Sequence, residues 1–157
     1  MKQRTRGLAM ALTTLAYISE ARPGLMLKDL KQILRRSREK NHRHAVTGYL
    51  VFDGTYFAQI LEADDTVLDL LLPTIVADDR HEDLRLLLCE PIIERNFDGW
   101  CMGCANLAAP VHLDTSELKG LIRDVVGQRS LSLPDAVDFF QLFVSFRTPQ
   151  QAALLTL

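Results

Sequence analysis

The sequence is poor in cysteine and has no excess of basic charge. Its 157 residues include three cysteines, an odd number that gives no complete disulfide framework and is typical of a reducing compartment. We therefore expect a cytoplasmic protein. The formal net charge is -2 at pH 7. We expect no nucleic-acid partner, because nonspecific binding to nucleic acid depends on basic patches that meet phosphate.

Long apolar runs are also missing. No stretch is long enough to cross a membrane, so no membrane association is expected. Three cations among the first six residues precede the apolar run 7–12, a pattern that faintly resembles a secretory signal. Thr13 and Thr14 interrupt this run, and a strand pattern follows it. We therefore expect a strand at this position rather than a leader.

Signatures of nucleotide cradles, metal sites and catalysis are absent as well. There is neither a G-x-G-x-x-G after a strand nor a Walker loop, which excludes a Rossmann-type site. Cys101 and Cys104 lack a second pair to complete a zinc tetrahedron. His42 and His44 are explained by the preference for cations at a helix C-terminus. We predict no metal site, and without a nucleophile–base pair or carboxylate dyad we predict no enzyme.

The hydrophobic patterns predict an α+β fold. They indicate, in chain order, a strand at 11–19, a helix at 26–40, strands at 46–52 and 55–62, a helix from Asp64 or Asp65, and strands at 84–89 and 100–105. Asp53-Gly54 marks a hairpin between the second and third strands. Pro73 is expected to kink or divide the second helix. This order is ferredoxin-like β-α-β-β-α-β with an added fifth strand.

Two helical stretches follow, at 116–126 and 134–146. The second is apolar almost all round, so it must be buried on the open face of the sheet or against a partner. We divide the chain into a domain at 1–106 and a helical cap at 107–157.

Two amides are candidate binding groups. Gln59 lies in an apolar strand, on the same face as Phe57 and Leu61. A buried amide must find partners, so Gln59 is either satisfied within the protein or directed at a polar ligand in an apolar pocket. Asn41 is expected just past the end of the first helix, where asparagine often caps. Its carboxamide can still face a cleft.

Motifs in a characteristic order give the chain a family resemblance over about residues 12–106. They are Leu15-Ala16-Tyr17-Ile18-Ser19, the run Leu27-x-x-Leu30-x-x-Ile33-Leu34-x-x-Ser37 with Asn41 and Thr47-Gly48, Phe57-Ala58-Gln59-Ile60-Leu61-Glu62, Asp78-x-Arg80-His81, and Glu90-Pro91-Ile92 with Arg95, Phe97, Trp100 and Met102. Together they resemble a BLUF domain, the flavin-binding family of blue-light sensors.

The resemblance implies FAD held between the two helices. Asn41 would bind the polar edge of the flavin ring, and Gln59 would reach its N5 and O4 region while bonded to Tyr17. Light would drive electron and then proton transfer, which leaves Gln59 rearranged by rotation or tautomerisation and shifts the absorption to the red. The implied cofactor-binding residues are Tyr17, Ser37, Lys40, Asn41, Gln59, Asp78, Arg80 and His81.

Trp100 and Met102 would complete the photoactive switch. We expect both on the strand beside the glutamine strand, sharing one face, so that they relay the amide movement. An equal alternative is that either residue only fills the core of the sheet. The output would pass to a separate downstream signalling protein or to a homo-oligomer.

The sequence departs from the family pattern at three positions. Lys40 stands directly before Asn41, Thr74 follows Pro73 in the second helix, and Ala63 follows Leu61-Glu62. These changes leave Tyr17 and Gln59 in place but affect the expected contacts to the ribityl chain and the phosphates of FAD. Lys40 or Arg80 would instead supply the positive charge for the phosphates. The resulting prediction is a short blue-light photoreceptor. The alternatives are a light-insensitive flavin-binding scaffold and a small acyl-phosphate hydrolase, which would leave Tyr17 and Gln59 without a role.

Overall fold

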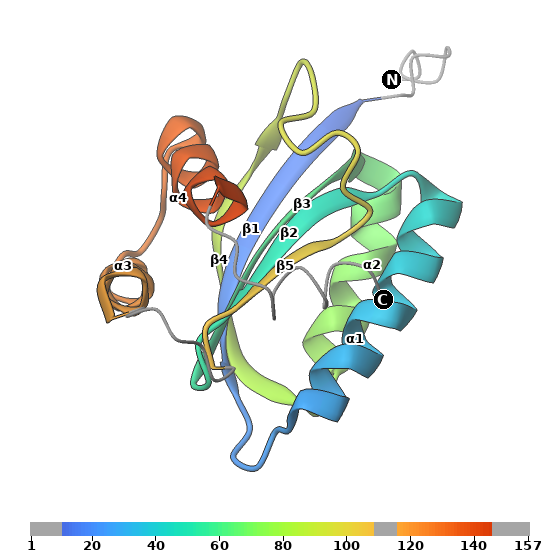
Figure 1. The fold of residues 1–157 in the computed structure, drawn as a ribbon. Helices are drawn as coiled ribbons and strands as arrows, with labels where there is room; N and C mark the ends of the chain where they lie inside the picture. Colours follow the sequence, from blue (N-terminus) through green and yellow to red (C-terminus); the bar gives the residue numbers. More distant parts are fainter. Residues whose placement is uncertain (1–10, 109–115, 146–157) are drawn as a thin grey trace.

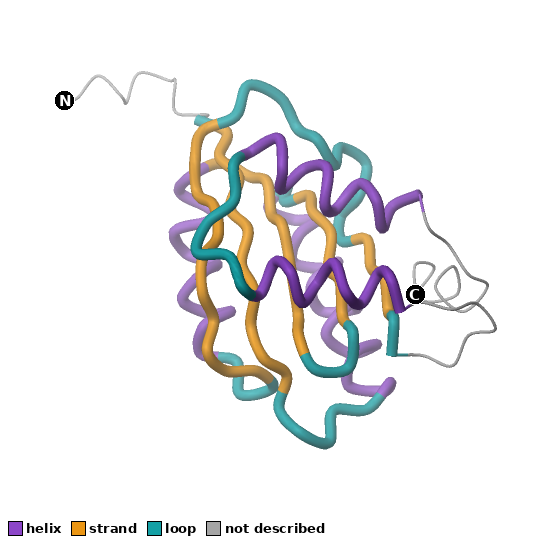
Figure 2. The backbone as a smooth tube through the Cα atoms, turned by 90° about the vertical axis from the view of Figure 1, so that its left-hand side faces the viewer, coloured by secondary structure: helices purple, strands orange, loops and turns teal. Residues whose placement is uncertain are grey.

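The computed structural model describes residues 11–108 and 116–145. A five-stranded sheet carries two helices on each face (Figures 1 and 2). In chain order the elements are β1 (Leu12–Ala21), α1 (Leu27–His44), β2 (Thr47–Phe52), β3 (Tyr56–Asp64), α2 (Asp65–Ala77), β4 (His81–Pro91), β5 (Gly103–Asn106), α3 (Ser116–Val126) and α4 (Leu133–Ser145). No helix in the described ranges is long and apolar enough to span a membrane.

The strand order is β4-β1-β3-β2-β5. The first four strands pair antiparallel, and β5 is added at the edge, parallel to β2, with Tyr49 opposite Gly103. The ferredoxin-like prediction with a fifth strand is therefore confirmed. β5 is shorter than expected, so Trp100 and Met102 precede it. It also pairs with β2 rather than with β3, the strand that carries Gln59.

Helix α1 is longer than predicted. It continues through His44 and ends at Ala45, whose φ of 54° is left-handed. Asn41 therefore lies in the last turn of the helix, and its expected position past the helix end is wrong. The physical reason is that residues 38–44 contain neither glycine nor proline to stop the helix.

Helix α2 contains Pro73 but runs undivided from Asp65 to Ala77. Asp64 caps it as predicted, by accepting a 3.0 Å hydrogen bond from the Thr66 amide. The proline removes one backbone donor. It lies only one turn before the end of the helix, so few helical hydrogen bonds are affected.

Each face of the sheet has its own apolar core. α1 and α2 cover one core, which contains Tyr17, Leu50, Leu61 and Met102. α3 and α4 cover the other, where Phe140 and Phe143 of α4 are fully buried. This confirms that α4 lies on the sheet's open face. The division at residue 106 stays a prediction.

Candidate functional site

Tyr17 and Gln59 are the central pair of the site. They face each other on β1 and β3, and both are buried, at 4% and 7% exposure. The Tyr17 hydroxyl donates a 2.5 Å hydrogen bond to Gln59 Oε1. Burial raises the pKa of the Tyr17 phenol well above its ordinary value, and the negative charge of Asp78 raises it further. The phenol therefore keeps its proton and donates it toward the amide.

The other half of the Gln59 amide contacts Met102. Gln59 Nε2 lies 3.2 Å from Met102 Sδ, and a thioether is a weak acceptor. Among residues 11–108 and 116–145, sulfur is the only partner of this amide nitrogen, which retains the capacity to bond a stronger acceptor. Of the two interpretations of Gln59, this contact favours the one in which it faces a polar ligand.

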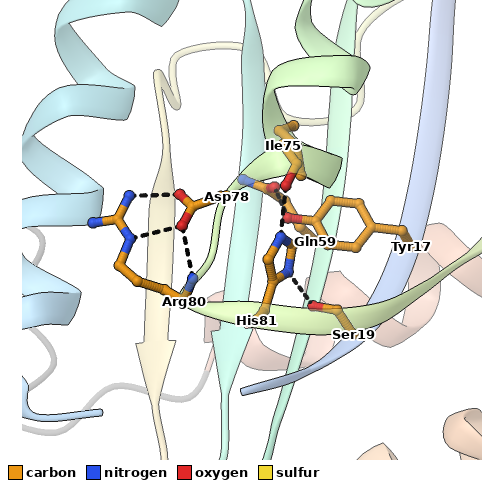
Figure 3. Close-up of polar contacts among 7 residues, drawn as sticks. All are labelled: Tyr17, Ser19, Gln59, Ile75, Asp78, Arg80 and His81. Atoms are coloured by element: carbon orange, nitrogen blue, oxygen red, sulfur yellow. Dashed lines mark hydrogen bonds and ion pairs between the residues drawn. The ribbon is translucent and has the colours of Figure 1, made fainter. Parts of the chain in front are cut away.

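His81, on the neighbouring strand β4, lies beside Tyr17 (Figure 3). Its Nε2 lies 2.6 Å from the Ile75 carbonyl and its Nδ1 lies 2.7 Å from Ser19 Oγ. A carbonyl only accepts, so Nε2 carries a proton, and in the neutral ring Ser19 donates to Nδ1. The His81 ring meets the Tyr17 ring edge-on at 6.2 Å. His81 thus ties the end of α2 to β1 and restrains the Tyr17 ring.

Asp78 and Arg80 form a bidentate pair just after α2 (Figure 3). Arg80 Nε and Nη2 donate to the two carboxylate oxygens at 2.9 and 2.5 Å, and the Arg80 amide donates at 3.0 Å. The hydrogen bond from the Arg80 side chain is the largest cause that holds the pKa of Asp78 below its usual value. The two charges therefore largely cancel.

A pocket of about 600 Å³ lies between α1 and α2, within the range of ligand sites. Its apolar lining comes from Ile33, Leu61, Leu71, Pro73, Ile75, Ala77 and Met102, and its polar lining from Arg36, Ser37, Lys40, Asn41, Gln59, Thr74, Asp78 and Arg80. Apolar walls with amide groups at one side suit a flat aromatic ring that has a polar edge. The residues present thus fit a flavin. Tyr17 and His81 lie behind this lining, connected to it through Gln59 and Ile75.

Asn41 is 4% exposed, and its Nδ2 donates a 2.6 Å hydrogen bond to the Cys101 carbonyl. Asn41 also lines the pocket, and a carboxamide oxygen can accept a hydrogen bond. Arg38 Nε donates to the Met102 carbonyl at 3.0 Å. Helix α1 therefore holds the backbone of residues 101 and 102 in place beside Gln59.

Trp100 and Met102 do not share a face. Met102 belongs to the core beneath α1 and α2. Trp100 packs against the core of the other face, where its ring meets Tyr49 edge-on at 5.7 Å. The expectation of a common face is wrong, because both residues precede β5 and the alternation of a strand does not apply to them.

The sequence analysis assigned no role to three residues that line the site or hold the backbone near it. Arg36 lines the pocket one helical turn before Lys40, a spacing that could have revealed it. Arg38 gave no signal, because its contact is with a distant backbone carbonyl. Glu62 is fully buried. Its carboxylate accepts hydrogen bonds from the Thr47 hydroxyl and from the backbone amides of residues 96 and 97.

The cysteines form no disulfide within the described residues. Burial raises the pKa of the Cys104 thiol to about 12, so it stays protonated and unreactive. No cluster of potential metal ligands occurs among the residues that the structure describes.

Comparison with known proteins gives one consistent result. A family model described as sensors of blue light using FAD matches residues 12–103. The blue light- and temperature-regulated antirepressor BluF of Escherichia coli (strain K12) is 29% identical over 134 residues, 85% of this chain and 33% of that protein. The photoactivated adenylate cyclase subunit beta of Euglena gracilis is 38% identical over 87 residues, 55% of this chain and 10% of that protein.

Solved structures agree. The dark state of the BLUF protein BlrB superposes with a TM-score of 0.68 at 30% identity, and the match covers 87% of this chain and 96% of that one. The ground state of BlsA, at 21% identity and a TM-score of 0.70, shows the same fold. The chain spans about a third of the antirepressor and a tenth of the cyclase subunit. The family model covers more than half of the sequence, and the chain belongs to the BLUF family of blue-light sensors.

Proposed function

We propose that this chain is a blue-light photoreceptor that binds FAD non-covalently in the pocket between α1 and α2. The observation that carries this proposal is the Tyr17–Gln59 hydrogen bond, which presents the amide to the pocket wall. Asn41 and Gln59 would hold the polar edge of the flavin, with Ser37, Lys40 and Arg80 around it. When bound and excited by blue light, the flavin supplies a strong one-electron oxidant.

The photochemical step uses the groups already in contact. Tyr17 is the oxidisable side chain, and its hydroxyl proton already lies on the line to Gln59 Oε1. Loss of one electron from Tyr17 to the excited flavin would make this proton acidic, so that it passes to the amide. Gln59 would then rotate or tautomerise, and return of the electron and the proton would restore Tyr17. The rearranged amide presents different donors and acceptors to the pocket, which shifts the absorption to the red.

Met102 would be the first residue to respond to this change. Gln59 Nε2 must leave Met102 Sδ if the amide rotates. The carbonyls of Met102 and Cys101 are held by Arg38 and Asn41, so the response falls first on the Met102 side chain. Trp100, two residues earlier, lies on the opposite face of the sheet. We propose that this segment carries the signal from the flavin face to α4.

The output would go to a separate protein or to a homo-oligomer. The relatives named above include an antirepressor and a cyclase subunit, in which a light-sensing region serves another activity. We propose that this region performs no catalysis itself.

The visible absorption spectrum in the dark and directly after blue light tests the proposal. A flavin spectrum that shifts slightly to the red and recovers in darkness is expected. Bound flavin that shows no shift would instead indicate a light-insensitive flavin-binding scaffold. A colourless protein that cannot be reconstituted with FAD would refute the proposal.

A further inference from the structure

A groove lies between α3 and α4, on the face of the sheet opposite to α1 and α2 (Figures 1 and 2). Its volume is about 410 Å³. The apolar part of its lining consists of Leu121, Val125, Leu131, Phe139 and Leu142. Leu142 is 43% exposed, so apolar surface at the mouth of this groove is accessible to water.

The edge of the α3–α4 groove is acidic. Asp124 of α3 and Asp135 and Asp138 of α4 are exposed and belong to its lining. Among the described residues that line the groove there is no lysine or arginine. None of these carboxylates forms an ion pair with another residue of the described ranges. Apolar surface bordered by unneutralised carboxylates is complementary to an apolar group that is followed by cations.

The start of α1 has this complementary chemistry. Met26, at the N-cap, is 60% exposed, and Leu27 is 48% exposed. Lys28, Lys31 and Arg35 follow at positions i, i+3 and i+7, so they share one side of the helix and form a basic stripe. All three are exposed, and none has an ion-pair partner in the part of the chain that the structure describes.

The basic stripe and the groove match in spacing as well as in charge. Lys28 and Lys31 are three residues apart, as are Asp135 and Asp138, so each pair spans about one helical turn. Helix α1 contains seven lysine and arginine residues and two carboxylates. Helix α4 contains two carboxylates and no lysine or arginine. The two helices therefore attract each other if they belong to different copies of the chain.

We propose that the α3–α4 groove binds the start of α1 from a second copy of this chain. Met26 and Leu27 of one copy contact the apolar lining, while Lys28 and Lys31 pair with Asp138 and Asp135. Each copy offers the stripe on one side of its sheet and the groove on the other (Figure 2). The contact is therefore head-to-tail, and its repetition builds rings or open chains of copies.

This contact specifies the homo-oligomer named in the proposed function, and it rests on that proposal only for its role in the output. None of the four charged residues lines the pocket between α1 and α2. Their substitution therefore changes association without removing a flavin contact.

The test is analytical ultracentrifugation of the full chain at about 50 mM and about 500 mM salt. We expect the weight-average molar mass to rise with protein concentration at low salt and to fall at high salt, because salt screens the charge pairs. Lys28→Glu/Lys31→Glu, the stripe variant, and Asp135→Lys/Asp138→Lys, the groove variant, should each associate at least about tenfold more weakly. Like charges would meet in both variants.

A mixture of the two variants gives the decisive result. The lysines of the stripe variant's partner then meet its intact carboxylates, and the reversed charges also meet with opposite sign, so association should return. Glu94→Lys/Asp98→Lys is the control, since it changes the net charge as the groove variant does at exposed positions outside both surfaces. It should associate as wild type does.

A wild-type molar mass that does not depend on salt or concentration would overturn the inference, as would a mixture that fails to associate. Loss of association in the groove variant alone would assign the groove to another basic segment, such as residues 1–10, and would also overturn it. The light-induced red shift is recorded on the same samples. Its absence would contradict the proposed function and leave the head-to-tail contact standing.

Discussion

The hydroxyl of Tyr17 and the amide oxygen of Gln59 are joined across the β1–β3 ladder at 2.5 Å. Both side chains lie in the core beneath α1 and α2, and the nitrogen of the same amide meets the sulfur of Met102. One buried amide thus separates an oxidisable phenol from a thioether. Any change in the amide's orientation must alter both contacts together.

Tyr17→Phe removes the oxidisable hydroxyl and the donor to Gln59. We expect this variant to bind flavin and to lose the light-induced red shift completely, because neither electron nor proton can come from the ring. Absorption spectroscopy before and after illumination measures the effect. Tyr56→Phe, on β3 and packed on the other core, should keep a normal photocycle. A red-shifted state that still forms in Tyr17→Phe would contradict the mechanism.

Glu62→Gln tests the buried carboxylate that holds residues 96 and 97. The glutamine has one acceptor oxygen for several donors and turns an NH₂ group toward backbone amides. We expect a loss of about 2–4 kcal/mol in the free energy of unfolding, measured in urea. Glu94→Gln, at an exposed position nearby, should change stability little. Equal stability of the two variants would show that the Glu62 contacts contribute nothing.

Gly103→Ala tests the close approach of β5 to β2. A Cβ at Gly103 would lie 2.4 Å from the Tyr49 ring and 2.7 Å from the Trp100 ring. We expect destabilisation of about 1–3 kcal/mol from overpacking, measured by denaturant unfolding. Gly120→Ala is the control, since α3 has open space at this residue. It should stabilise the protein by about 0.5–1 kcal/mol. A neutral Gly103→Ala would mean that the aromatic pair can move apart freely.

The Asp78–Arg80 pair predicts a pH dependence of stability. The pKa of Asp78 is lowered in the folded protein, chiefly by Arg80. Its stabilising contribution is therefore present above its unfolded pKa of about 4 and is lost as the pH falls through the lower folded value. Asp78→Asn should lower stability at neutral pH and flatten the fall in stability below about pH 4. Unfolding curves at several acidic pH values measure this, and an unchanged acid profile would refute it.

Most of the fold was predictable from local patterns. Asp53-Gly54 between two β-rich runs indicated the hairpin, and the periodicity of residues 27–34 indicated α1. The exit of α1 was not predictable to the residue, because Ala45 ends the helix in a left-handed conformation that its type does not signal. The start of β5 was misplaced because pairing with β2, distant in sequence, decides where that strand begins.

By itself, the sequence determined the order of strands and helices, the buried position of Gln59 on the face of Phe57 and Leu61, and the motifs that link Tyr17, Asn41 and Gln59. These depend on residue type and on spacing within one element. Only the tertiary structure decided that Met102 reaches Gln59 while Trp100 turns to Tyr49 on the opposite face. It also decided that Asp78 neutralises Arg80. These relationships depend on contacts between elements far apart along the chain, which no local pattern encodes.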